Sequence, residues 1–137
     1  MAVIVPAASE NNLLNFLLGV TVPGNQIMKL YVNNVTSTDD TLLAAGFTEM
    51  STLGYVSKSL TKTSWVVAQS GALVAAGTYA QQTWTFTAGT LVTVYGYYVV
   101  DTTSGLLLWF EAFTASKAIQ NNGDQIIITP TLTLSKT

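Results

Sequence analysis

The strongest constraint on the fold is the stretch 91–113, which reads LVTVYGYYVVDTTSGLLLWFEAF. Two runs rich in Val, Leu and aromatic residues flank the segment 101–105, DTTSG. Asp at the start and Gly at the end of this segment are typical of a hairpin turn, and the flanking runs have the composition of strands. The sequence therefore predicts a long β-hairpin.

The length of the turn predicts which residues lie opposite each other in this hairpin. A five-residue loop gives the pairs Val100–Leu106, Tyr98–Leu108, Gly96–Phe110 and Val94–Ala112. In this register the ring of Phe110 would cover the bare Gly96, a contact that fixes strand register.

Both faces of the predicted hairpin are apolar. The face that carries the pairs above has no polar side chain other than the Tyr98 hydroxyl. The opposite face is also too apolar for the solvated side of an antiparallel sheet. Its residues are Thr93, Tyr95, Tyr97, Val99, Leu107, Trp109, Glu111 and Phe113. We therefore expect both faces to be covered.

The composition indicates a surface that is buried against other molecules. Only 9% of the 137 residues are charged, compared with about 25% in a typical soluble domain. Thr, of which there are 21, supplies most of the polar surface and favours strands. The apolar runs are far shorter than the roughly 20 residues of a membrane helix. We therefore expect one non-membrane domain that contacts further copies or another protein.

Several classes of function are excluded by residues that the chain lacks. It contains no His, Cys or Arg, which removes Ser-His-Asp and Cys-His catalysis, thiolate or imidazole metal sites, and bidentate phosphate binding. We expect no enzyme activity, no cofactor and no metal site. A net charge of −2 without a basic run argues against nucleic-acid binding. The N-terminus lacks a signal-peptide pattern, so synthesis and folding in a cytoplasm are expected.

Residues 1–19 are predicted to form an N-terminal arm and a short helix. The arm is the extended apolar segment 2–5, which ends at Pro6. Ser9 is the expected N-cap, and the helix is expected to end at Gly19. Its apolar residues are Leu13, Leu14, Phe16, Leu17 and Leu18. Such a short helix must dock, either on its own domain or on a neighbour, and the sequence leaves both open.

The rest of the chain is predicted to form short strands. In the segment 83–87, TWTFT, Trp84 and Phe86 point to the core and the threonines to solvent. Further strands are expected over 28–33, 55–60, 65–68, 125–129 and 131–135, with a break or edge at Pro130. The small apolar segment 72–76, ALVAA, is expected to be an edge strand or an interface loop. Residues 42–50 are expected to be a loop with a short helical or strand piece. We therefore predict a single antiparallel β-sandwich, 1–137, of about eight short strands, with jelly-roll connectivity as one option.

The motifs that could carry chemistry are weak. Ser59 and Lys62 match the S-x-x-K pattern of penicillin-recognising enzymes, but in a strand and turn rather than a helix. Nothing in the sequence brings Glu49 and Glu111 together as an acid/base pair. Glu111 is expected to accept a hydrogen bond from a tyrosine or to pair with a Lys at an interface.

Four aspartates in polar loops could bind calcium through their oxygens. These are Asp39, Asp40, Asp101 and Asp124. No complete calcium-binding loop motif is present, so Asx-turn hydrogen bonding is the favoured interpretation.

The second hairpin face is the candidate contact surface. Tyr95, Tyr97 and Trp109 could form a second core layer, an oligomer interface or a platform for sugars. We place Trp84 in the core and Trp109 at a contact surface. The full candidate interface is Tyr95, Tyr97, Trp109, Glu111, Phe113, Leu13, Leu14 and Leu17.

Five segments together resemble small proteins encoded among the head genes of tailed bacteriophages. These segments are NNLLN in the predicted helix, KLYVNNVT at 29–36, VYGYYV at 94–99, LLWFE at 107–111 and GDQIIITPTLTL at 123–134. The resemblance implies a virion structural protein, most simply a capsid decoration or cement protein built as a β-sandwich, and it carries over no active-site residue.

Together with the composition, the resemblance predicts the place of the protein in the virion. We expect a homo-oligomer, with a trimer favoured, that binds the major capsid protein on the capsid surface and stabilises the shell. The alternative is a receptor- or glycan-binding module of a tail or head fibre.

Overall fold

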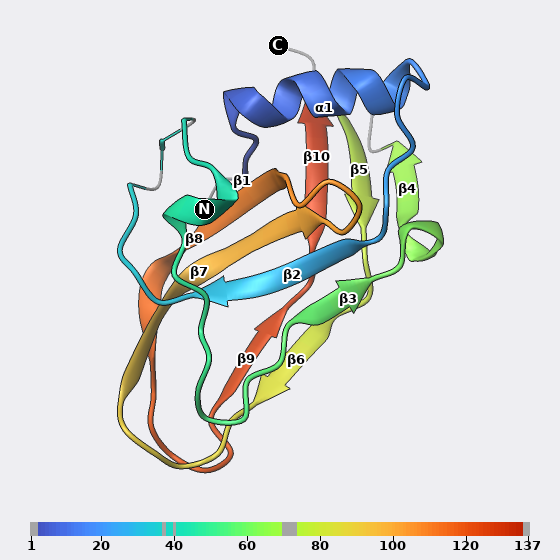
Figure 1. Ribbon diagram of the computed structural model, residues 1–137. Helices are drawn as coiled ribbons and strands as arrows, with labels where there is room; N and C mark the ends of the chain where they lie inside the picture. Colours follow the sequence, from blue (N-terminus) through green and yellow to red (C-terminus); the bar gives the residue numbers. More distant parts are fainter. Residues whose placement is uncertain (1–2, 37, 40, 70–73, 136–137) are drawn as a thin grey trace.

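The computed structural model describes residues 3–36, 38–39, 41–69 and 74–135. It contains one α-helix, two short 3₁₀ helices and ten strands within this part of the chain (Figure 1). In chain order they are β1 (Val3–Ile4), α1 (Ala7–Leu17), β2 (Gln26–Tyr31), η1 (Ala44–Gly46), β3 (Lys58–Leu60), η2 (Lys62–Ser64), β4 (Val66–Gln69), β5 (Val74–Thr78), β6 (Gln82–Thr85), β7 (Val92–Asp101), β8 (Leu107–Ile119), β9 (Gln125–Ile128) and β10 (Thr131–Ser135).

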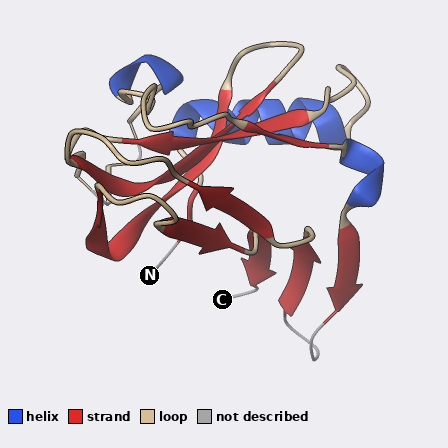
Figure 2. Cartoon of the chain, turned by 90° about the horizontal axis from the view of Figure 1, so that it is seen from below, coloured by secondary structure: helices blue, strands red, loops and turns tan. Residues whose placement is uncertain are grey.

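The strands form two layers, as the views in Figures 1 and 2 show. The first layer is one sheet in the order β1-β8-β7-β2-β3. The second layer contains two small sheets, β10-β5-β4 and β6-β9. Pro130 lies at the bend between β9 and β10, where its carbonyl accepts a hydrogen bond from Tyr79 N–H at 2.9 Å. All strand pairs are antiparallel, so the predicted antiparallel, sandwich-like fold is confirmed.

The main core lies between the two layers. Trp84 and Phe86 of the TWTFT segment are buried while its threonines are exposed, as the alternation predicted. The indole N–H of Trp84 donates to Val56 O at 2.8 Å, so burying this polar group costs little. The remaining buried members of this core are Met28, Leu30, Met50, Leu60, Val94, Tyr97, Val99, Leu108, Trp109, Ile119 and Ile126.

A second apolar cluster covers the other face of the first layer. Phe47, just after η1, stacks on Tyr98 with ring centroids 4.6 Å apart and also contacts Tyr31 and Phe110. The loop that carries Phe47 therefore covers this face. Both faces of the central hairpin are covered within one chain, as its apolar pattern predicted.

The predicted register of the hairpin is wrong by two residues. Gly96 pairs with Ala112, and Tyr98 pairs with Phe110. One residue of this shift arises at the turn, where Val100 pairs with Leu107 rather than Leu106. The second arises from an irregularity between Val99 and Val100, where β8 holds one extra residue. β-bulges of this kind cannot be read from the apolar pattern.

Gly96 is covered by an aromatic ring, but by Tyr31 rather than by Phe110. Tyr31 of β2 is the strand partner of Gly96. A Cβ placed on Gly96 would lie 2.8 Å from a ring carbon of Tyr31 and would clash with the carbonyl oxygen of Glu111. Only glycine therefore fits at this position.

The segment predicted to be a free arm is the edge strand β1. Val3 pairs with Glu111 and Ile4 with Phe110 of β8. Its apolar residues alternate between the two faces of the sheet, and both faces are covered. The segment therefore belongs to the domain, while residues 1–2 lie outside the described part of the chain.

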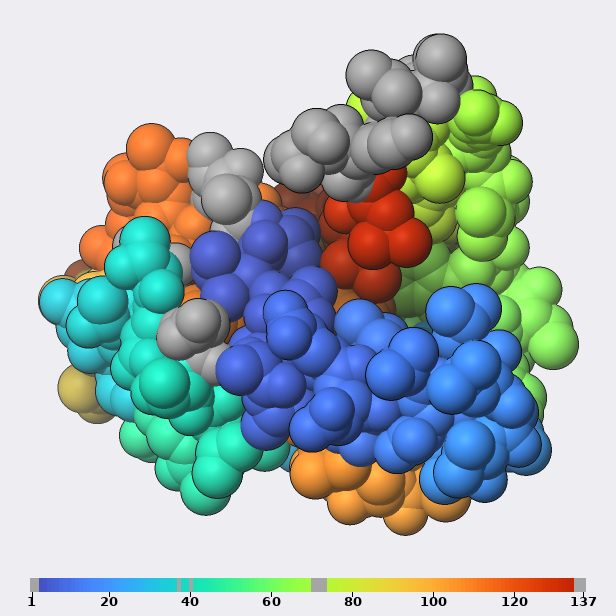
Figure 3. All heavy atoms as spheres, turned by 90° about the horizontal axis from the view of Figure 1, so that it is seen from above, coloured from blue at the N-terminus to red at the C-terminus, as the bar shows by residue number. Residues whose placement is uncertain are grey.

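Helix α1 begins earlier than predicted and lies across one end of the molecule, beside β10, β4 and β5 (Figures 1 and 3). Its N-cap is Pro6, not Ser9. Ser9 is buried inside the helix, and its hydroxyl donates to the backbone oxygen of Leu107. Phe16 packs against the main core, and Gly19 follows the helix at φ 69°. The helix therefore caps its own domain. No helix in the described residues is long and apolar enough to cross a membrane.

Candidate functional site

The second layer has a surface without charge. Its five strands contain no Asp, Glu, Lys or Arg, because residues 63–100 and 125–135 contain none. Soluble surfaces normally mix charges of both signs at about 25–35% of positions. Several exposed side chains of this layer are also apolar, namely Val66, Val67, Ile127 and Leu134. This surface costs little to remove from water, which is the property of an assembly surface.

An apolar hollow of about 310 Å³ lies between α1 and this layer. Leu13 and Phe16 line it from the helix, and Val67 and Leu134 line it from β4 and β10. In Figure 3 the blue helix borders the strands drawn in red and green. Leu17, the residue after Phe16 on the helix, is 82% exposed. The helix and the second layer therefore share one apolar hollow, and each exposes further apolar side chains.

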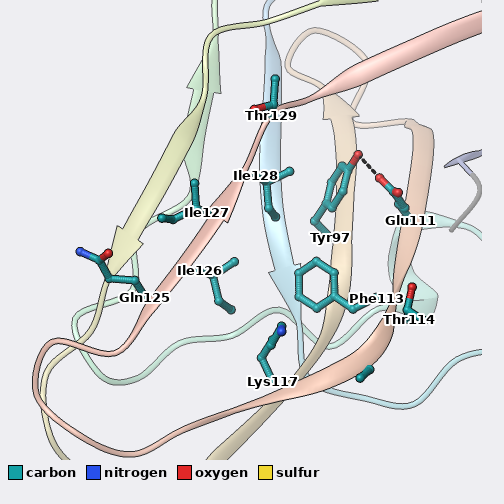
Figure 4. A pocket seen from close by; sticks show the side chains of 11 residues that line it. Tyr97, Glu111, Phe113, Thr114, Lys117, Gln125, Ile126, Ile127, Ile128 and Thr129 are labelled. Carbon is teal, nitrogen blue, oxygen red and sulfur yellow. Dashed lines mark hydrogen bonds between the residues drawn. The ribbon is translucent and has the colours of Figure 1, made fainter.

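A second hollow, of about 630 Å³, opens where β8 bends away from β7. Between the pairs Gly96–Ala112 and Val94–Lys117, β7 holds one residue and β8 holds four. This bulge opens a cleft between β8 and β9 (Figure 4). The cleft is lined by Tyr97, Glu111, Phe113, Thr114, Ala115, Lys117, Gln125, Ile126, Ile127, Ile128 and Thr129.

The cleft combines an apolar floor with polar groups at its ends. Phe113 and Ile126 form part of the floor, and Lys117 lies at one end (Figure 4). The side chain of Gln125 lies on the other side of β9, where its amide donates to Thr85 Oγ1 at 3.0 Å (Figure 4). The Tyr97 hydroxyl donates to Glu111 Oε2 at 2.5 Å, as predicted for Glu111. Burial, and then the Glu111 carboxylate, raise the pKa of Tyr97 above its ordinary value. This tyrosine therefore stays neutral at physiological pH and serves as a hydrogen-bond donor.

The carboxylates singled out in the sequence have structural contacts. Glu49 pairs with Lys29 Nζ at 2.9 Å and accepts a hydrogen bond from the Tyr55 hydroxyl at 3.1 Å.

Lys62 lies in η2 and donates to the backbone oxygen of Pro23, while Ser59 lies on β3. The strand-and-turn context expected for Ser59 and Lys62 is confirmed.

Three of the four candidate calcium-binding aspartates cap turns instead. Asp101 is buried, and its carboxylate accepts hydrogen bonds from Gly24 N, Thr103 N, Ser104 N and Ser104 Oγ at 2.7–3.1 Å. The favoured Asx interpretation is thus confirmed for Asp101.

The other two described aspartates act in the same way. Asp39 accepts from Thr41 N, and Asp124 accepts from Gln120 N and Asn121 N. Asp40 lies outside the described residues. Within the described ranges, no three His, Cys, Asp or Glu residues gather as a metal site.

The predicted interface residues do not form one surface. Trp109 is 4% exposed and Tyr97 is 1% exposed, which corresponds to the second-core-layer alternative for these two side chains. Tyr95 packs against the cluster on the opposite face, because the bulge in β8 interrupts the alternation. The sequence pattern had placed all three on one face. The buried Trp109 and Tyr97 offer no stacking platform for a sugar.

The remaining candidates lie at the two hollows. Glu111 and Phe113 line the cleft, and Leu13 lines the apolar hollow. Leu14 and Leu17 are exposed on α1. The charge-free second layer was missed, although the signal is the absence of charge over 63–100 and 125–135. The cleft was missed because the pattern does not show the bulge.

Comparison with known proteins supports a fibre rather than a capsid decoration protein. No curated protein matches the chain. The model of the family described as Podophage GP4 fiber I protein gp80 matches residues 5–135. This match covers nearly the whole chain and favours the fibre alternative raised by the sequence. The chain therefore belongs to the podophage GP4 fiber I protein gp80 family and is a non-enzymatic structural component of a phage virion fibre.

Proposed function

We propose that this chain is a self-assembling subunit of the fibre, with a homotrimer as its expected state. The observation that carries the proposal is the charge-free second layer, whose outer surface holds exposed apolar side chains. Charge keeps soluble proteins monomeric, and a surface without it gains by burial against another copy. Assembly, rather than chemistry, is the property that this surface provides.

The helix contributes to the same surface. Leu14 and Leu17 face solvent on α1, next to the hollow that the helix forms with the second layer. Leucines exposed in this way are costly to leave in water, about 25 cal/mol for each Å² of apolar surface. We therefore include both leucines in the proposed contact surface.

The mass of the purified protein in solution tests this proposal. The chain is 14.6 kDa, and light scattering should give about three times this mass, as expected for a closed trimer. Ile127→Lys places a charge on the second layer at a side chain that is 52% exposed. This variant should shift the mass towards that of the monomer.

Leu91→Lys is the matched control, because Leu91 is 53% exposed and lies outside the second layer. It should leave the mass unchanged. A wild-type protein that stays monomeric at micromolar concentration would overturn the proposal. Labelling on purified virions should mark fibres, and labelling over the whole capsid would contradict the fibre location.

Receptor or glycan binding is a second candidate, and the cleft between β8 and β9 is the observation that favours it. A polar ligand could receive hydrogen bonds from Lys117 while its apolar face lies over Phe113. Such a mixture of apolar floor and few polar groups is typical of ligand sites.

A host-cell adsorption assay tests this second candidate. Lys117→Ala should reduce adsorption of fibre-bearing phage at least tenfold, equal to about 1.4 kcal/mol, without a change in assembly. Asn11→Ala, an exposed polar change on α1, is the control. Unchanged adsorption by Lys117→Ala would exclude the cleft as the receptor site.

A further inference from the structure

We propose that copies of this chain join edge to edge, with β4 of one copy pairing with β10 of the next. This inference rests on the homotrimer proposed above and specifies its contact. Each of these two edge strands would therefore pair with an edge strand of a second copy.

The sheet β10-β5-β4 has two unpaired outer edges. Within the described residues, β4 and β10 each pair only with β5. Such edges expose N–H and C=O groups, and natural proteins usually protect them with charged residues, proline or very short strands. Here β4 reads VVAQ and β10 reads TLTLS, without charge or proline. Both edges are therefore open to strand addition.

The edges of the first layer are protected in the usual way. On one side β3 is only three residues long and carries Lys58. On the other side β1 covers Phe110 and Glu111 of β8, and the uncovered part of β8 carries Lys117. The contrast within one molecule points to the second layer, where β6 and β9 also have uncharged outer edges. Of these edges we choose β4 and β10, because they carry the exposed Val66, Val67 and Leu134.

The side chains at both bare edges also lack cover. Val66 and Val67 are adjacent on β4 and therefore point to opposite faces of the sheet, yet both are exposed. Leu134 on β10 lies on the same face as Val67, since both line the hollow beside α1. A strand added at either edge would bury apolar side chains as well as satisfy backbone groups.

Three-fold symmetry selects β4 with β10 rather than β4 with β4. A pair of identical edges forms around a two-fold axis and gives a dimer, whereas a trimer needs two different surfaces that meet head to tail. Both β4 and β10 run antiparallel to β5, so they point in the same direction. A three-fold axis along the strands therefore pairs β10 with a parallel β4.

The register of this contact follows from the sheet itself. Ala68 pairs with Ala76, and Ala76 pairs with Thr133, so these three residues lie in one row. Rotation about an axis along the strands keeps each row at its level. Ala68 of the next copy should then lie beside Thr133.

Cysteine crosslinking tests the contact cleanly, because the chain has no cysteine. The double variant Ala68→Cys/Thr133→Cys should form a covalent trimer under mild oxidation. A bond within one chain is excluded, because β5 separates the two positions by two strand spacings of about 4.8 Å each, beyond the usual Cα separation in a disulfide of about 7 Å or less. Each single variant should form no crosslink.

The outcomes separate this contact from the trimer itself. A covalent trimer of the double variant, with uncrosslinked single variants, supports the proposed pairing. A crosslinked dimer of Ala68→Cys alone would show β4 against β4 and overturn it. Absence of crosslinks in a protein that light scattering shows to be trimeric would overturn the edge contact but not the trimer. A monomeric wild-type protein would overturn both.

A charge test is independent of disulfide geometry. Ala68→Lys should weaken trimer association at least tenfold, about 1.4 kcal/mol, because it places an unpaired charge in the contact. Adding Thr133→Glu in the same chain should restore much of the loss, since the two charges then meet between copies. Circular dichroism checks that each variant is folded. Equal association of all three proteins would contradict the proposed contact.

Discussion

The two layers of this sandwich differ in how their apolar side chains are covered. The first layer is covered on both faces by its own chain, through the main core on one side and the Phe47 loop on the other. Its strands also carry charged residues, namely Lys29, Lys58, Asp101, Glu111 and Lys117. The second layer carries none and exposes apolar side chains. The difference indicates that the first layer determines the fold and the second layer serves contacts with other molecules.

The largest difference between the layers should appear at high pH. Burial and the nearby Glu111 raise the pKa of Tyr31 to about 12, and burial and Glu49 raise that of Tyr98 to about 12. The pKa of Tyr97 is also raised. All three side chains are buried in the first layer. Their contribution to stability is complete below pH 10, where the folded and unfolded chains are both protonated.

Between pH 10 and 12 only the unfolded chain loses these protons, so stability falls with pH. Tyr55, whose hydroxyl oxygen accepts a hydrogen bond from Leu30 N of β2, also has a pKa raised by burial. The free energy of unfolding should decrease by about 1.4 kcal/mol per pH unit for each tyrosine, or about 6 kcal/mol for the four. Urea unfolding followed by tryptophan fluorescence measures it. Tyr98→Phe should reduce the slope by one quarter. A free energy that is constant from pH 10 to 11 would contradict this assignment.

Removal of either core tryptophan should also cause a large loss in the free energy of unfolding. Trp84 is 3% exposed and Trp109 is 4% exposed, so Trp84→Ala and Trp109→Ala should each cost about 3 to 5 kcal/mol. The sequence had placed Trp109 at a contact surface, which would make its loss less damaging to the fold. Chemical unfolding of both variants decides the point. A loss for Trp109→Ala below about 1 kcal/mol would contradict its place in the core.

Two glycines give a matched comparison between the layers. Gly96→Ala in β7 should cost about 1 to 3 kcal/mol, because its Cβ would clash with Tyr31 and with the Glu111 carbonyl. Gly77→Ala in β5 meets its nearest atoms at 3.8 Å, an ordinary contact. This variant should change the free energy of unfolding by less than about 1 kcal/mol. It could even increase that free energy, because Ala lowers the conformational entropy of the unfolded chain. Thermal unfolding measures both, and equal losses would remove the contrast.

The smallest effect on folding is expected at the exposed apolar residues. Leu17→Ser on α1 and Val67→Thr on β4 should change the free energy of unfolding by less than about 0.5 kcal/mol. Dissociation of the oligomer on dilution is the informative readout, and both variants should dissociate at higher concentration than wild type. Unfolding should therefore be measured where wild type and variants are in the same oligomeric state. A large loss of fold would show that these side chains belong to the domain core.

The sequence alone determined most of the strands and most of the buried set, but it predicted a loop after Phe113, where β8 continues to Ile119. Alternation in TWTFT placed Trp84 and Phe86 in the core, because side chains of a strand point to opposite faces. The turn residues around Asp101 and Asp124 were also predictable, since Asx hydrogen bonds are local. The absence of His, Cys and Arg excluded whole classes of catalytic site.

The tertiary structure decided the features that depend on distant residues. A bulge moved Tyr95 away from Tyr97 and opened the cleft, and no pattern in the single strand shows such an insertion. Gly96 is covered by Tyr31 rather than Phe110, because β2 is its neighbour in the sheet. The charge-free segments were visible in the sequence, but only the fold brings β4, β5 and β6 together with β9 and β10 as one layer and places the charge-free part of β7 in the other. Local periodicity specifies which face a residue prefers, and packing between layers decides what covers that face.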